Sequence, residues 1–102
     1  MAYIWQVNEI HRTPEFIKWL KGLKDIAGKA RIETRITRLG MGLPGDVKPA
    51  REGVFEMRID CGPGYRVYFT KRGFTLVILL AGGDKSTQDR DIEIAIRMAR
   101  NL

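Results

Sequence analysis

Three consecutive segments suited to strands, separated by short turns, constrain the fold of this chain more than any other feature of its sequence. Apolar and polar side chains alternate in residues 54–60 and 65–70, whereas residues 74–81 are predominantly apolar. Alternation predicts strands with one buried face, and a continuous apolar run predicts a central strand covered on both faces. Because the turns at 61–64 and 71–73 are so short, we expect the three strands to be antiparallel neighbours.

Two helices and a further strand are expected before these segments. Residues 3–10 are rich in side chains that favour strands. Thr13 and Pro14 predict a helix start, because threonine caps the first amides and proline fits the first helical position. Asp25 predicts the start of a second helix, which ends at Gly40-Met41-Gly42. The apolar stripes of the two helices are Phe16, Leu20 and Leu23 for the first, and Ala30, Ile32, Ile36 and Leu39 for the second.

The remaining segments complete the expected fold. Residues 42–50 are rich in Gly and Pro and predict a loop, and residues 82–85 are expected to end the last strand. Ser86 predicts the cap of a C-terminal helix that docks on the sheet. The apolar stripe of this helix is Ile92, Ala95, Ile96 and Ala99. The order β-α-α-β-β-β-α describes a single α+β domain over residues 1–102, with a helical hairpin packed on a small, mainly antiparallel sheet.

Composition and charge narrow the class of protein. Hydrophobic residues make up 44% and charged residues 29% of the 102 residues, which excludes wholesale disorder. No apolar run approaches the ~20 residues that span a bilayer, and no signal-peptide pattern is present, so we expect a cytoplasmic protein without membrane contact. The net charge of +6 favours a polyanionic partner. A single cysteine, Cys61, excludes an internal disulfide and a cysteine-based zinc site.

The polar face of the predicted hairpin carries the strongest chemical signal. If its apolar face packs against the helices, Glu56, Arg58, Arg66 and Tyr68 share the opposite face. Two guanidinium groups on one small surface can bind phosphate oxygens through paired hydrogen bonds. The alternative is a cross-strand salt bridge between Glu56 and one of the arginines on a solvated sheet.

Lys85 follows two glycines at a predicted strand end and precedes a helix. It can therefore present a cation beside the amides of a helix start, where an anion would bind. The alternative is a strand terminator followed by an ordinary helix cap. A nucleotide-binding P-loop is excluded, because Asp84 and Leu79 stand where that motif needs glycine.

Arg31, Arg35 and Arg38 recur at i, i+4 and i+7 on the second predicted helix. Such a stripe can follow a nucleic-acid backbone without reading its sequence, or it can be the solvated face of an amphipathic helix. His11 is the only histidine and lies far in sequence from these arginines. The sequence contains no Ser-His-Asp set and no cluster of metal ligands, so we expect no metal or cofactor.

Several short motifs follow one another along the whole chain. They are Phe16-x-x-Trp19-Leu20, Arg35-Ile36-x-Arg38-Leu39, Gly45-Asp46-x-Lys48-Pro49, Gly53-Val54-x-Glu56-x-Arg58-Ile59, residues 62–68 (GPGYRVY) and residues 82–88 (GGDKSTQ). Together they resemble the RelE/ParE toxin superfamily, in its branch of phage-derived, HigB-like addiction-module killer proteins. The runs at 62–68 and 82–88 are the parts specific to that branch.

The resemblance implies the toxin of a type II toxin–antitoxin system. Such a toxin is an mRNA interferase that cuts messenger RNA, usually on the ribosome, and a cognate antitoxin silences it. The antitoxin is expected to be a small helix-turn-helix protein encoded by an adjacent gene. The implied reaction is attack of the ribose 2′-hydroxyl on the adjacent phosphate, with cationic side chains in place of a metal.

The resemblance also implies roles for individual residues. Arg66 corresponds to the phosphate-stabilising arginine, with Arg58 beside it, and Lys85 occupies a loop that carries catalytic residues. Tyr68 would orient the base or the 2′-hydroxyl, and Lys48 would contact RNA. The general acid and base stay open, because no histidine or tyrosine follows Tyr68.

Two other functions remain in view at this point. One is a ParE-like inhibitor that binds DNA gyrase and does no chemistry, and the other is a plain nucleic-acid-binding module. The cluster of Arg58, Arg66 and Lys85 favours cleavage over gyrase binding. The arginine stripe of the second helix would also suit an acidic segment of the antitoxin.

Overall fold

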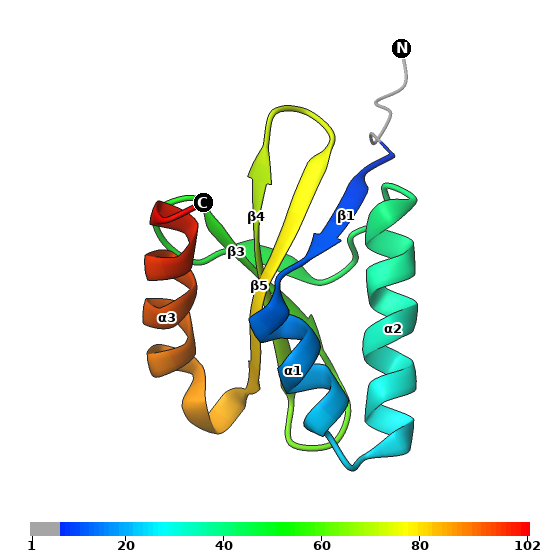
Figure 1. The fold of residues 1–102 in the computed structure, drawn as a ribbon. Coiled ribbons are helices and arrows are strands. Elements are labelled where there is room, and N and C mark those ends of the chain that lie inside the picture. The colour runs from blue at the N-terminus through cyan, green and yellow to red at the C-terminus, as the bar shows by residue number, and fades with distance from the viewer. Residues whose placement is uncertain (1–6) are drawn as a thin grey trace.

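A mixed sheet forms the centre of the computed structural model, which describes residues 7–102 (Figure 1). Its strand order is β1-β5-β4-β3-β2, and only the β1–β5 pair is parallel. The strands are β1 (Glu9–Arg12), β2 (Val47–Pro49), β3 (Val54–Ile59), β4 (Tyr65–Arg72) and β5 (Leu76–Asp84). The α+β class is therefore confirmed, and β3, β4 and β5 are the antiparallel neighbours that their short turns predict.

Helices cover both faces of this sheet, as Figure 1 shows. Helices α1 (Pro14–Gly22) and α2 (Ile26–Gly40) lie on one face. Helix α3 (Gln88–Arg100) lies on the other face and follows a short 3-10 turn, η1 (Lys85–Thr87). Within residues 7–102, every helix is too short or too polar to cross a membrane.

Each face of the sheet has its own hydrophobic core. The core under α1 and α2 contains Phe16, Leu20, Ile32, Ile36, Leu39, Met57, Ile59, Tyr65, Val67, Phe69, Val77 and Leu79. The core under α3 contains Val54, Tyr68, Leu80, Ala81, Ala95, Ile96 and Ala99. Strand β5 contributes to both, so its apolar run indeed marks a central strand covered on both sides. The docking of the C-terminal helix on the sheet is also confirmed.

The predicted starts of α1 and α2 are confirmed. Thr13 Oγ1 accepts a hydrogen bond of 3.1 Å from the Phe16 amide, and Asp25 Oδ1 accepts one of 2.9 Å from the Gly28 amide. One member of the predicted stripe of α2 is wrong, because Ala30 is exposed. Its position on the helix turns it away from the sheet.

The glycines at the end of β5 continue the strand, so the prediction that residues 82–85 end it is wrong. A β-carbon at Gly82 would lie 2.1 Å from Trp19 Cε3, and one at Gly83 would lie 1.8 Å from Asp91 Oδ2. These glycines let α1 and α3 approach the sheet closely. The cap prediction for Ser86 is also wrong, since Asp84 accepts a 2.8 Å hydrogen bond from the Ser86 amide.

Two strands differ from their predicted positions. Part of the strand expected at residues 3–10 lies outside the described residues, and the observed β1 begins at Glu9. The loop expected at residues 42–50 contains β2, which pairs with β3 through its backbone. A three-residue edge strand needs no alternating side chains, so its sequence carries no strand pattern.

Candidate nucleic-acid interface

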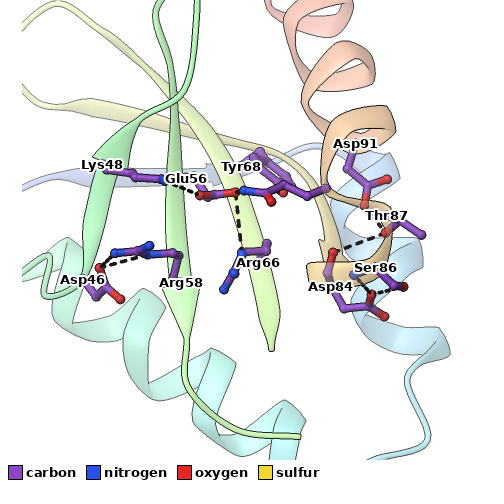
Figure 2. Close-up of polar contacts among 11 residues, drawn as sticks. Asp46, Lys48, Glu56, Arg58, Arg66, Tyr68, Asp84, Ser86, Thr87 and Asp91 are labelled. Carbon is purple, nitrogen blue, oxygen red and sulfur yellow. Dashed lines mark hydrogen bonds and ion pairs between the residues drawn. The ribbon is translucent and has the colours of Figure 1, made fainter. Parts of the chain in front are cut away.

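Polar side chains form two adjacent rows on the α3 face of the sheet (Figure 2). Strand pairing aligns Lys48 with Glu56 and Glu56 with Tyr68 in the first row. In the second row, Arg58 lies opposite Arg66. The prediction that Glu56, Arg58, Arg66 and Tyr68 share one face is therefore confirmed, but this face is not uniformly solvated.

Glu56 is a charged side chain in the protein interior, with an exposed fraction of 0%. Its Oε2 accepts hydrogen bonds from the Tyr68 hydroxyl at 3.1 Å and from Gln88 Nε2 at 2.7 Å. Two cations lie just beyond hydrogen-bond distance, Arg66 Nε at 3.7 Å and Lys48 Nζ at 3.9 Å. A buried carboxylate needs such partners, because an unpaired charge away from water is strongly unfavourable.

Arg66 is a largely enclosed cation, with 12% of its side chain exposed. Its Nε is buried without a hydrogen-bond partner within residues 7–102, and its one ion pair there is with Glu56. The arginine also lies near Lys85, because a β-carbon at Gly64 would be 4.0 Å from Arg66 Nη1 and 3.4 Å from Lys85 Cβ. Arg66 and Lys85 therefore flank the same turn.

The Arg58 side chain is more exposed to solvent than that of Arg66. Its Nε and Nη2 donate hydrogen bonds of 3.1 Å and 2.8 Å to Asp46 Oδ1. This contact lowers the pKa of the Asp46 carboxyl and raises the pKa of the Arg58 guanidinium. Because both side chains reach solvent, the ion pair is exchangeable, and an incoming anion can compete with Asp46 for Arg58.

Lys85 begins η1, directly after the capping residue Asp84. Within residues 7–102 the lysine makes no ion pair. We call Lys48, Arg58, Arg66 and Lys85 the cationic sheet face. Three of these residues come from neighbouring strands and the fourth from the turn that follows β5. The fold thus brings together four cations that are spread over 38 residues of sequence.

Tyr68 does not present its hydroxyl to a substrate. The side chain is fully buried beneath α3 and donates its proton to Glu56. Burial, and then the Glu56 charge, raise the pKa of the Tyr68 phenol far above its ordinary value. The expected orienting contact with RNA therefore conflicts with its position, and Tyr68 acts on the site only through Glu56.

The three arginines of the stripe on α2 differ in their exposure to solvent. Arg31 and Arg38 are exposed, whereas Arg35 is half-buried and donates to the Arg58 carbonyl at 2.6 Å and the Pro44 carbonyl at 3.0 Å. Burial lowers the pKa of the Arg35 guanidinium. The simple solvated stripe is therefore wrong for Arg35, which fastens α2 to the edge of the sheet.

A cavity of about 460 Å³ opens beside Arg35. We call it the arginine cavity, and its lining residues are Arg31, Thr34, Arg35, Arg38, Asp46, Arg58, Ile59 and Asp60. Arg58 and Asp46 also belong to the region of the cationic sheet face. The two basic regions are thus continuous around the β2–β3 edge of the sheet.

Two other residues considered from the sequence, His11 and Cys61, lie outside the two basic regions. His11 is exposed on β1 and contacts Glu9, and Cys61 is half-buried in the turn after β3. No group of three or more potential metal ligands occurs within residues 7–102.

Sequence reasoning missed Gln88 and Asp46 as partners of the site. Gln88 reaches Glu56 across 32 positions of sequence, and only the packing of α3 reveals that contact. Asp46 lies in a segment predicted as a loop, so its contact with Arg58 becomes evident only when β2 pairs with β3.

Comparison with known proteins yields one informative relative. No family model matches the sequence. The chain is 51% identical to an uncharacterized protein of Haemophilus influenzae over 94 residues, which covers 92% of this chain and 95% of the relative. Identity at this level over nearly the full length of both chains means that this protein belongs to the family of that Haemophilus influenzae protein.

Proposed function

We propose that this protein is a toxin that cleaves RNA on the cationic sheet face. The observation that carries the proposal is the enclosed guanidinium of Arg66, with Arg58 opposite it and Lys85 beside it. Only the buried Glu56 balances Arg66 within residues 7–102. Like charges gathered in one place repel one another, so this cluster is best stabilised by a bound anion. A phosphodiester matches the planar guanidinium groups in charge and geometry.

The reaction that such a cluster can support is transfer of a phosphoryl group within RNA. The ribose 2′-oxygen bonds to the adjacent phosphorus, and the bond from phosphorus to the 5′-oxygen breaks. The 2′-hydroxyl loses a proton and the leaving 5′-oxygen gains one, which gives a 2′,3′-cyclic phosphate and a 5′-hydroxyl. Negative charge grows on the phosphorane, and Arg58, Arg66 and Lys85 would stabilise it without a metal.

An RNA-cleaving toxin requires control in its cell, so the proposal includes an antitoxin that binds and silences it. A small helix-turn-helix protein from an adjacent gene is the expected partner, and messenger RNA on the ribosome is the expected substrate. The net charge of +6 favours association with RNA, which is a polyanion.

The test is cleavage of a labelled RNA by the purified protein, both alone and on programmed ribosomes. The expected products carry a 2′,3′-cyclic phosphate, and a substrate with 2′-deoxyribose at the cut position stays intact. Arg66→Ala should lower the rate by roughly 10²–10³, the loss expected for one transition-state donor. Arg97→Ala, at an exposed arginine of α3, is the matched control and should leave the rate unchanged.

Arg66 also balances the buried carboxylate of Glu56, so Arg66→Ala carries a stability penalty as well. Arg66→Lys resolves this difficulty, because it keeps a positive charge near Glu56 but lacks the planar fork. We expect Arg66→Lys to fold and still to lose rate.

Lys85→Arg and Lys85→Met separate two roles of the lysine. If arginine restores the rate and methionine does not, Lys85 acts as a fixed charge, since arginine cannot give up its proton near neutral pH. If neither variant retains activity, Lys85 transfers a proton to the leaving oxygen.

The proposal fails if RNA stays intact in both settings. Inhibition of DNA supercoiling by gyrase in the same preparation would favour the ParE-like alternative. If RNA is cut but Arg66→Ala and Arg66→Lys cut it at the wild-type rate, the reaction does not take place on the cationic sheet face.

A further inference from the structure

The arginine cavity is a second basic site next to the cationic sheet face. It lies between α2 and the β2–β3 edge of the sheet, and its volume of about 460 Å³ falls within the range of small-molecule binding sites. A lone inorganic phosphate is too small to fill it, whereas a nucleotide unit is of suitable size.

The wall of this cavity is built and held in place. Arg35 donates to three backbone carbonyls, those of Arg58, Pro44 and Asp46, so its guanidinium is fixed at the junction of α2 and the sheet. Gly45 has a φ of +69°, and a β-carbon there would lie 3.0 Å from Arg35 Nη2. The glycine therefore lets the loop close over the arginine. Arg35 supplies positive potential and shape to the cavity.

Two further arginines can move to meet a ligand. Arg31 precedes Arg35 by four residues and Arg38 follows it by three, so all three lie on one side of α2. Arg31 and Arg38 are exposed, and neither side chain makes a hydrogen bond or ion pair within residues 7–102. Four arginines thus line the cavity against two carboxylates, and one of these, Asp46, is already paired with Arg58.

We propose that the arginine cavity binds the sugar–phosphate backbone of the same RNA strand, next to the nucleotide held on the cationic sheet face. This inference rests on the proposed function. Arg58 connects the two sites, because it lies opposite Arg66 across the strands and is also one of the residues that line the cavity. A strand leaving Arg66 along this edge would pass Arg58 and reach the cavity that Arg31 and Arg38 also line.

The connection through Arg58 favours RNA over an acidic protein segment as the occupant. A continuous polyanion can satisfy both sites at once, and its phosphates recur at regular intervals along the strand. Backbone contacts of this kind position a substrate without reading its sequence. The role of the cavity is therefore to hold the strand in register for cleavage.

The test measures binding of RNA that cannot be cleaved, so it does not depend on activity. The probes are 2′-O-methyl oligonucleotides of two, four and eight nucleotides, and the variant is Arg31→Ser with Arg38→Ser. Lys18→Ser with Lys21→Ser is the control, because it removes the same charge from exposed positions of α1. Circular dichroism verifies that each variant folds.

We expect affinity to rise with length in the wild type, and the double arginine variant to lose about tenfold for the octanucleotide but little for the dinucleotide. The slope of log affinity against log salt should become shallower by about 1.4, which corresponds to two lost phosphate contacts on a single strand. The lysine control should lose less in both measurements.

Equal effects of the arginine and lysine variants would overturn the inference. So would an affinity that does not depend on RNA length. If a glutamate-rich peptide loses affinity in the arginine variant while the octanucleotide does not, the cavity binds protein and the inference is wrong.

Failure of this inference can be told from failure of the proposed function. Length-dependent binding that needs Arg31 and Arg38, without cleavage of ordinary RNA, would retain the subsite and reject the nuclease. Cleavage that needs Arg66, with an unchanged salt slope in the arginine variant, would retain the nuclease and reject the subsite.

Discussion

Removing the hydroxyl of Tyr68 tests whether Glu56 is held as a buried, hydrogen-bonded carboxylate. In Tyr68→Phe the ring keeps its place in the core under α3, so no cavity forms. The 3.1 Å hydrogen bond to Glu56 Oε2 is lost, and both partners have an exposed fraction of 0%. Hydrogen bonds to charged groups contribute about 1.5–3 kcal/mol, because the group left behind cannot regain water.

The loss is large enough to measure by thermal unfolding. For a domain of this size, each kcal/mol shifts Tm by about 4 °C, so Tyr68→Phe should lower Tm by about 6–12 °C. Unfolding in urea, followed by circular dichroism at pH 7, should give the same loss with an unchanged dependence on denaturant concentration.

Tyr65→Phe is the matched control for this experiment. Tyr65 also donates to a carboxylate, Asp25 Oδ2 at 2.8 Å, but Asp25 is only half-buried and water can replace the hydroxyl. We therefore expect a smaller fall in Tm for Tyr65→Phe. Equal losses, or no loss in Tyr68→Phe, would refute the reasoning and would mean that water reaches Glu56 beneath α3.

Two further predictions concern packing and acid stability. Gly82→Ala should destabilise the fold by about 1–3 kcal/mol, because its new methyl group would overlap Trp19, whereas Gly22→Ala has open space and should be neutral or stabilising in urea unfolding. A Gly82→Ala variant as stable as Gly22→Ala would contradict the close approach of α1. Hydrogen bonds and ion pairs lower the pKa of four carboxyls in the folded protein, those of Asp25, Glu33, Asp46 and Asp84. These contacts therefore stabilise the fold fully above the unfolded pKa of about 4, and this stabilisation is lost as the pH falls through the lower pKa values of the folded state. Asp25→Asn should flatten that acid loss in pH-dependent thermal unfolding, and an unchanged profile would show that the contact with the Gly28 amide does not act in solution.

Local patterns in the sequence determined most of the elements. Period-two alternation identified β3 and β4, and Thr13 and Asp25 marked the starts of α1 and α2 correctly. These signals work because they depend on residues within one turn or one strand of each other. The same alternation brought Arg58 and Arg66 onto one face, since that conclusion needs only the pairing of two adjacent strands.

Tertiary packing decided the character of the site. Alternation assigns Glu56 and Tyr68 to a polar face, but it cannot tell whether a distant helix covers that face. Helix α3 does so, and Gln88 completes the buried network. Likewise, the spacing of Arg31, Arg35 and Arg38 describes one helix surface, whereas the edge of the sheet determines that Arg35 is anchored to backbone carbonyls. The physical reason is that a side chain's direction is set by its own backbone, while its burial and partners are set by whatever element packs against it.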